Sequence, residues 1–165
     1  MKTILLVRHA KSSWDDFSIA DIDRPLNNRG KKDAPEMANR LLEKKIDIDA
    51  FVSSPAKRAR KTAEVFCKAY GHKKKEVVIE EDLYEAGESQ FSEVIASLPN
   101  ADNTVALFSH NPGITEFANT LTTTRIDNIP TTGVFAVQAD TDDWKGFSSA
   151  SKQLWFFDFP KNAFD

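Results

Sequence analysis

The chain has 165 residues, of which 41% are hydrophobic and 28% are charged, with a formal net charge of −3 at pH 7. This length suits one well-buried core, so we expect a single domain over residues 1–165, and the composition excludes intrinsic disorder. The small negative charge gives no electrostatic basis for binding nucleic acid, and charges interrupt every apolar run before it could span a bilayer, so we predict a cytoplasmic protein that binds neither nucleic acid nor membrane.

The N-terminal third predicts a strand, a long loop and a helix. Residues 4–7 form an apolar β-like run, and the polar stretch 11–26 that follows lacks any periodicity. In residues 27–45, apolar side chains recur at helical spacing, which predicts a helix with Asn27 as its N-cap.

A second strand and helix follow. Residues 50–53 predict a short strand, after which Ser54 is expected to cap a helix whose first residue is Pro55. The single cysteine, Cys67, lies on the apolar side of this helix, which is typical of a small buried hydrophobe and not of a nucleophile. The charged run 71–76 predicts a solvated turn.

The second half of the chain continues the alternation and ends in two β-rich segments. The expected elements are a strand at 77–79, a helix at 91–98, a strand at 105–108, a helix at 114–121, and strands at 134–139 and 153–159. Asn111 and Pro112 are expected to cap the second of these helices. Repeated β-loop-helix units predict an α/β fold, a three-layer α/β/α sandwich around a mostly parallel central sheet.

Two of the three histidines share one context. His9 and His110 each directly follow a strand-like run, and ligand sites in α/β sheets form where strands end. A lone histidine is more often structural than catalytic, but two in this context beside arginine or a helix start indicate chemistry on phosphate. A zinc site would need three or four protein ligands, and the chain has neither an HxxxH nor a paired-cysteine motif. We therefore expect no metal and no cofactor.

Two arginines fit a phosphate pocket. Arginine keeps its charge and binds phosphate oxygens through two parallel hydrogen bonds. Arg8 immediately precedes His9, and Arg58 follows Pro55 near a helix start, where free backbone amides favour an anion. The neighbouring basic residues Lys57, Arg60 and Lys61 are expected to form a solvated face.

Three separated motifs together resemble a known family. They are Leu-Val-Arg-His-Ala at 6–10, Ser-Ser-Pro-x-x-Arg-Ala-x-x-Thr-Ala at 53–63, and His-Asn-Pro-Gly at 110–113. In this order they resemble the histidine phosphatase superfamily, formerly called phosphoglycerate mutase-like, over nearly the whole chain. The short length and the element Asp21-x-x-Arg24-Pro25-Leu26 resemble the SixA type of phosphohistidine phosphatase.

The resemblance implies a four-residue pocket that needs no metal. His9 would be the nucleophile, and the phosphoryl oxygens would be bound by Arg8, Arg58 and a protonated His110. Arg24 would add a further phosphate contact, with Asp21 orienting it. An ordinary surface ion pair between Asp21 and Arg24 is the alternative.

The leaving group depends on Glu85. In phosphomonoesterases and mutases of the family, a glutamate in a Leu-x-Glu context protonates the departing alkoxide, and Leu83-Tyr84-Glu85 matches that spacing; a solvated loop carboxylate is the alternative. An imidazole leaving group relaxes the need for an acid. The resemblance therefore implies removal of phosphate from phosphohistidine on a protein domain, with a small phosphomonoester as the alternative substrate. A non-catalytic phosphate-binding module is the alternative function.

The length of the loops that connect the predicted elements indicates how large a substrate can reach the site. Mutase-type relatives carry longer insertions that form a lid, whereas the longest irregular stretch here is 11–26, so an open pocket suited to a protein-borne phosphate is expected. Trp14 and Phe17 in that stretch either form an apolar rim for a partner or pack onto the core. Ser109 stands where relatives often have glycine; its hydroxyl either lies near the phosphate or fills space.

Overall fold

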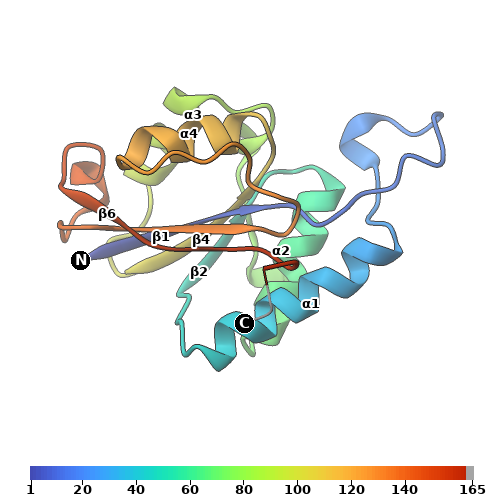
Figure 1. Cartoon of the computed structure of the whole chain (residues 1–165), viewed down its shortest axis with the longest axis horizontal. Helices are drawn as coiled ribbons and strands as arrows, with labels where there is room; N and C mark the ends of the chain where they lie inside the picture. The colour runs from blue at the N-terminus through green and yellow to red at the C-terminus, as the bar shows by residue number, and fades with distance from the viewer. Residues whose placement is uncertain (163–165) are drawn as a thin grey trace.

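A single six-stranded sheet forms the centre of the computed structural model, which describes residues 1–162 (Figure 1). Its strands are β1 (Lys2–Arg8), β2 (Ala50–Ser53), β3 (Val78–Ile79), β4 (Thr104–Ser109), β5 (Val134–Ala139) and β6 (Lys152–Asp158). Their order across the sheet is β3-β2-β4-β1-β5-β6.

The sheet is parallel on one side and antiparallel on the other. β3, β2, β4 and β1 run parallel, whereas β5 and β6 pair antiparallel to β1 and to each other. The parallel pairs are joined through helices, as such crossovers require. β5 and β6 follow one another without a long helix between them and therefore form an antiparallel pair. The predicted α/β class is confirmed, with this antiparallel edge as a refinement.

Helices cover both faces of the sheet, which gives the predicted three layers. They are α1 (Asn28–Glu43), α2 (Lys57–Ala69), α3 (Glu88–Ala96) and α4 (Gly113–Leu121). Figure 1 shows α1 and α2 below the sheet and α3 and α4 above it. Because strand side chains alternate between faces, Leu5 and Val7 of β1 pack between the sheet and the helices α1 and α2, whereas Ile4 and Leu6 pack on the opposite face of the sheet.

The helix starts follow the sequence prediction only in part. Asn27 caps α1, its side chain accepting a hydrogen bond from the Gly30 amide at 2.9 Å. The predicted start of the next helix is wrong. α2 begins at Lys57 with Ala56 as N-cap. Ser54 does not cap this helix, because its hydroxyl is hydrogen-bonded to His110, the residue that follows β4. Pro55 therefore lies before the helix.

α4 differs from expectation in the same way. Pro112 occupies the N-cap position but makes no capping side-chain bond. Asn111 lies outside the cap and its side chain bonds to Thr115 and Asn128, which ties the helix start to the segment that leads into β5.

Other expectations are confirmed. Cys67 is fully buried, residues 71–76 are exposed and contain one 3-10 turn, and strands lie within a residue or two of the predicted runs. In residues 1–162, no helix combines the length and apolar character needed to span a membrane.

The parallel strands bring their carboxyl ends to one edge. Arg8 of β1 pairs with Ser109 of β4, and Phe108 of β4 pairs with Ser53 of β2. The residues that follow these strands therefore meet at the same place, which is where ligands bind in open α/β sheets. In Figure 1 the loop between β1 and α1 extends beyond this edge.

Candidate active site

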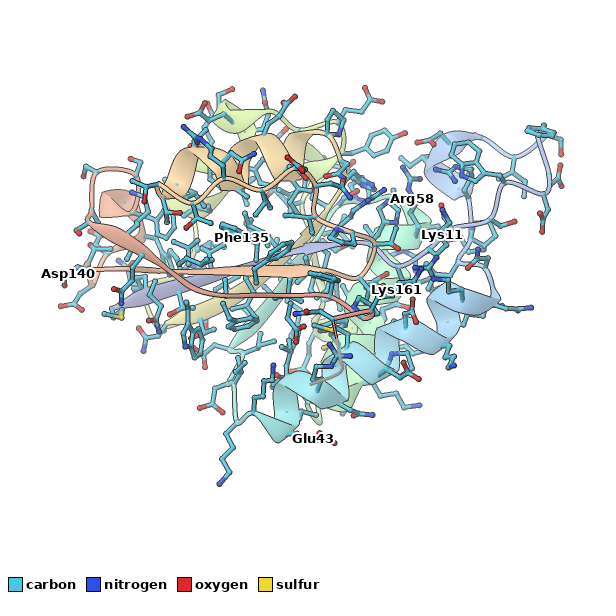
Figure 2. All side chains as sticks on the ribbon, viewed as in Figure 1. Lys11, Glu43, Arg58, Phe135, Asp140 and Lys161 are labelled. Carbon is cyan, nitrogen blue, oxygen red and sulfur yellow. The ribbon has the colours of Figure 1, made fainter. Side chains whose placement is uncertain are left out.

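A pocket of about 560 Å³ opens at the carboxyl ends of β1, β2 and β4. It brings together all seven residues that the sequence analysis selected for the site: Arg8, His9, Asp21, Arg24, Arg58, Glu85 and His110. Figure 2 shows Arg58 and Lys11 on the side of the molecule opposite to Asp140.

His9 lies at the end of β1 and is 7% exposed. Its Nδ1 is 2.7 Å from the Ala10 carbonyl oxygen. A carbonyl can only accept a hydrogen bond, so Nδ1 carries the hydrogen and Nε2 keeps its lone pair. Burial lowers the pKa of His9 well below its usual value despite the Ala10 bond, and His110, Arg58 and Arg8 lower it further. The imidazole is therefore neutral at pH 7.

His110 follows β4, and its ring centroid is 5.1 Å from that of His9. Its Nε2 is 2.7 Å from the Ser54 hydroxyl. Burial, followed by the positive charge of Arg58, lowers the pKa of His110 to about 3. The protein's own groups thus favour a neutral ring, contrary to the protonated His110 expected from the sequence.

Arg8 has no counterion among residues 1–162. Its Nη1 donates to the Ile129 carbonyl at 3.0 Å, and no carboxylate of residues 1–162 lies within 4.0 Å of its guanidinium. Burial and the charge of Arg58 both lower the pKa of Arg8. An anion bound beside Arg8 and Arg58 would offset the repulsion between their positive charges.

Asp21 joins the other two arginines. Its carboxylate accepts hydrogen bonds from Arg58 Nη2 at 3.1 Å and from Arg24 Nε at 3.1 Å, and its backbone carbonyl accepts from Arg58 Nη1 at 2.7 Å. Burial opposes ionisation of Asp21, but the 2.6 Å hydrogen bond from the Tyr84 hydroxyl and the charge of Arg58 outweigh it and lower the pKa to about 2. The arrangement is thus a four-residue network and not an isolated surface ion pair.

Arg24 is held within the loop that precedes α1. Its Nη1 donates to the Ser12 hydroxyl at 2.7 Å, and its guanidinium carbon lies 3.6 Å from the centre of the Trp14 ring, a cation-π contact. The Trp14 side chain is 59% exposed and Phe17 is 91% exposed. The alternative in which these two aromatics pack onto the core is therefore wrong: both lie at the surface, and Trp14 lines the pocket.

The segment with Glu85 is held against α4. The Ser109 hydroxyl donates to the Leu83 carbonyl at 2.7 Å, so it neither faces the pocket nor merely fills space. At Gly113 any Cβ would lie 1.9 Å from the Ala86 carbonyl oxygen, so only glycine allows this approach. Glu85 has a φ of 55° and its exposed side chain lines the pocket rim.

Three residues support the site in ways that the sequence reasoning did not identify. Thr62 accepts a hydrogen bond from the Ala10 amide at 2.9 Å and donates to the Arg58 carbonyl at 2.7 Å, which joins the His9 segment to α2. Ser54 contacts His110, and Tyr84 contacts Asp21. Thr62 is detectable in the sequence, since it lies one helical turn after Arg58 on the same face. Ser54 and Tyr84 depend on tertiary contacts.

No set of three or more histidine, cysteine, aspartate or glutamate side chains in residues 1–162 is grouped so that it could hold a metal ion.

Comparison with known proteins shows which family the chain belongs to. The model of the histidine phosphatase superfamily (branch 1) matches residues 4–97. An uncharacterized chloroplastic protein of Arabidopsis thaliana is 30% identical over 152 residues, which cover 87% of this chain and 69% of that protein. Phosphoserine phosphatase 1 of Hydrogenobacter thermophilus is 34% identical over 94 residues, 56% of this chain and 42% of that enzyme.

The fold is also that of a solved structure, the protein histidine phosphatase SixA complexed with tungstate. The two chains superpose with a TM-score of 0.81 at 21% sequence identity, covering 97% of this chain and 98% of the other.

Proposed function

The chain belongs to the histidine phosphatase superfamily and is a phosphatase, and we propose that it removes phosphate from phosphohistidine on a protein through a phosphorylated His9. One observation carries the proposal. His9 is a buried, neutral imidazole whose Nδ1 hydrogen is held by the Ala10 carbonyl, which leaves the Nε2 lone pair free to attack phosphorus.

In the first step, a bond forms between His9 Nε2 and phosphorus while the bond from phosphorus to the substrate imidazole breaks. The electron pair of that bond stays on the leaving imidazole nitrogen, and a proton from water neutralises it. The Ala10 carbonyl stabilises the positive charge that develops on the His9 ring, because the Nδ1 hydrogen points at it.

In the second step, water attacks the phosphorus of phospho-His9, and the bond from phosphorus to Nε2 breaks. Inorganic phosphate leaves and neutral His9 is restored. The hydroxide left by the first step takes the proton that the attacking water releases, so the sum is hydrolysis of one P–N bond by one water. Splitting one displacement into two lowers the barrier of each.

The arginines supply the electrostatic part of catalysis. Phosphoryl transfer requires mainly positioning and compensation of charge on the equatorial oxygens. Arg8, which has no carboxylate partner within the described part of the chain, and Arg58 would bind these oxygens, with His110 as a further donor. Arg24 would bind a further oxygen, and Asp21 would orient it together with Arg58.

The protein-borne substrate is supported by the surroundings of the pocket. The connections around it are short, and the exposed Trp14 and Phe17 lie on the surface of the neighbouring loop. The whole-length similarity to the SixA fold is consistent with a phosphohistidine on a partner domain.

A small phosphomonoester is a second candidate substrate, and Glu85 favours it. Its carboxyl side chain lines the pocket, where it could protonate an alkoxide leaving group. The similarity to phosphoserine phosphatase 1 of Hydrogenobacter thermophilus points in the same direction.

A side-by-side assay separates the two. We expect kcat/KM for a peptide carrying phosphohistidine to exceed that for phosphoserine and sugar phosphates by at least about tenfold, with His9→Ala inactive on all of them. A higher kcat/KM for the phosphomonoesters would assign the enzyme to small-molecule substrates. Phosphate binding without turnover of any of these substrates would instead favour a non-catalytic module.

A further inference from the structure

A second depression lies beside the phosphate pocket, between the loop that precedes α1 and the outer face of α2. Its volume is about 420 Å³. We call it the lysine groove, and its lining consists of an apolar floor surrounded by four lysines and one glutamate: Pro25, Leu26, Val65, Lys31, Lys57, Lys61, Lys74 and Glu64.

On two separate segments of the chain, a residue that lines the pocket is the sequence neighbour of a residue that lines the groove. Arg24 lines the pocket and Pro25 lines the groove; Arg58 lines the pocket and Lys57 lines the groove. Consecutive Cα atoms are only about 3.8 Å apart. A peptide whose phosphoryl group occupies the pocket would have to pass over these two segments to enter the groove, and an extended chain advances about 3.3 Å per residue.

The groove carries uncompensated positive charge. Lys61 lies 3.5 Å from Glu64, which also pairs with Arg60. For the remaining groove lysines, Lys31, Lys57 and Lys74, no carboxylate of residues 1–162 lies within 4.0 Å. This concentration of positive charge stands out in a chain whose net charge is −3. It attracts acidic groups from a partner.

The floor of the groove supplies an apolar contact. Val65 and Pro25 are half-buried, and Val65 packs against the cluster formed by Ala10, Leu26 and Ala34. The floor is therefore fixed by the core, and an apolar side chain resting on it would lose water from both surfaces.

We propose that the lysine groove binds an acidic segment of the substrate protein, next to the phosphorylated histidine, with one apolar side chain on the Pro25–Val65 floor. The proposal rests on the proposed function and names the partner chemistry for the same active site. The groove would select the protein that carries the phosphohistidine, and the pocket would carry out the reaction.

The test uses three synthetic peptides, each with one phosphohistidine and a leucine three residues away, flanked by glutamates, by serines or by lysines. We expect the parent enzyme to show a kcat/KM for the glutamate peptide roughly tenfold or more above that for the lysine peptide at low salt. Raising the salt to 0.5 M should reduce this preference, since exposed charges are then screened.

The variant for the test is Lys31→Glu/Lys74→Glu, which reverses two exposed lysines outside the phosphate pocket. It should lose the preference for the glutamate peptide while retaining parental turnover of the serine peptide and of an aryl phosphate. The matched control is Lys145→Glu/Lys161→Glu, with the same change in net charge at exposed lysines that line neither the pocket nor the groove. It should keep the preference.

Two results would overturn the proposal. One is an equal preference for the glutamate peptide in the parent and in Lys31→Glu/Lys74→Glu. The other is a loss of this preference in the control variant as large as that in Lys31→Glu/Lys74→Glu. A different result would show that the proposed function fails: the parent enzyme hydrolyses the aryl phosphate but none of the phosphohistidine peptides. In that case, fluorescence anisotropy with a labelled, unphosphorylated glutamate-leucine peptide still tests the groove. Its affinity should fall several-fold in Lys31→Glu/Lys74→Glu and not in the control, and equal affinities would contradict the proposal.

Discussion

The imidazole rings of His9 and His110 lie 5.1 Å apart, and the surroundings hold both of them neutral. His9 follows β1 and His110 follows β4, so their approach is set by the parallel pairing of these two strands. Neutral imidazole is the form that can attack phosphorus, and for His9 the same burial that excludes water keeps it in that form.

The two histidines make the stability of the protein depend on pH. In the unfolded chain their pKa is about 6.5, whereas folding lowers it well below that value for His9 and to about 3 for His110. Below pH 6.5 the unfolded state therefore binds more protons, and the free energy of unfolding should fall as the pH drops from 7 to 4.5. Each histidine contributes up to about 1.4 kcal/mol per pH unit in this window.

Urea unfolding at a series of pH values measures this slope. His9→Asn and His110→Asn should each make the dependence shallower, and His72→Asn, which removes an exposed histidine outside the pocket, is the matched control. Asp21, with a pKa of about 2 in the folded protein, adds to the loss only below about pH 5, where the unfolded carboxyl begins to bind protons. If the free energy of unfolding has the same slope against pH between 6.5 and 4.5 in the parent and in the pocket variants, the claim that both histidines are buried and neutral is contradicted.

Arg58→Lys keeps the positive charge at the pocket but removes the planar guanidinium group. Lysine cannot make two parallel hydrogen bonds to one phosphoryl group, so we expect kcat/KM for an aryl phosphate to fall by roughly 100-fold, about 2.7 kcal/mol of transition-state stabilisation. Arg60→Lys is the control, because Arg60 is on the same helix but pairs with Glu64. Equal activity of Arg58→Lys and the parent would remove Arg58 from the pocket.

Asp21→Asn tests the carboxylate that joins Arg58 and Arg24. Its charge opposes that of a bound phosphate, so its removal should tighten inhibition by inorganic phosphate several-fold at low salt. Tyr84→Phe removes only the hydroxyl bonded to Asp21 and keeps the charge, so its inhibition constant should stay close to that of the parent. Weaker inhibition in Asp21→Asn would show that orientation of the arginines outweighs charge.

Glu85→Gln separates the two classes of leaving group. If Glu85 protonates an alkoxide, its loss should lower kcat for alkyl phosphates by roughly 100-fold or more. Turnover of a phosphohistidine peptide should fall far less, because imidazole leaves more readily. Exposed Glu88→Gln, which lies outside the pocket, is the control. Equal losses on both substrates would contradict the leaving-group argument.

Much of the fold follows from local sequence signals. The apolar run before His9 and the run before His110 fix β1 and β4, and the Asn27 cap fixes the start of α1. These elements depend on side-chain periodicity and on capping, both of which act within a few residues.

The rest depends on contacts between distant segments. Ser54 has the local signature of a helix cap, but its hydroxyl bonds to His110. For Ser109 the sequence predicts either a hydroxyl near the phosphate or a side chain that fills space, whereas its hydroxyl donates a hydrogen bond to the Leu83 carbonyl. The protonation of His110 could not be read from its neighbours in sequence, because burial and the distant Arg58 decide it.

The most direct test of the central claim is capture of phosphorylated His9. When the enzyme is mixed with a radiolabelled phosphohistidine peptide and quenched within milliseconds in base, label should stay on the protein, be lost in acid, and map to His9 by mass spectrometry. Label that is absent from rapidly quenched enzyme during active turnover, or that maps to another residue, would contradict the account.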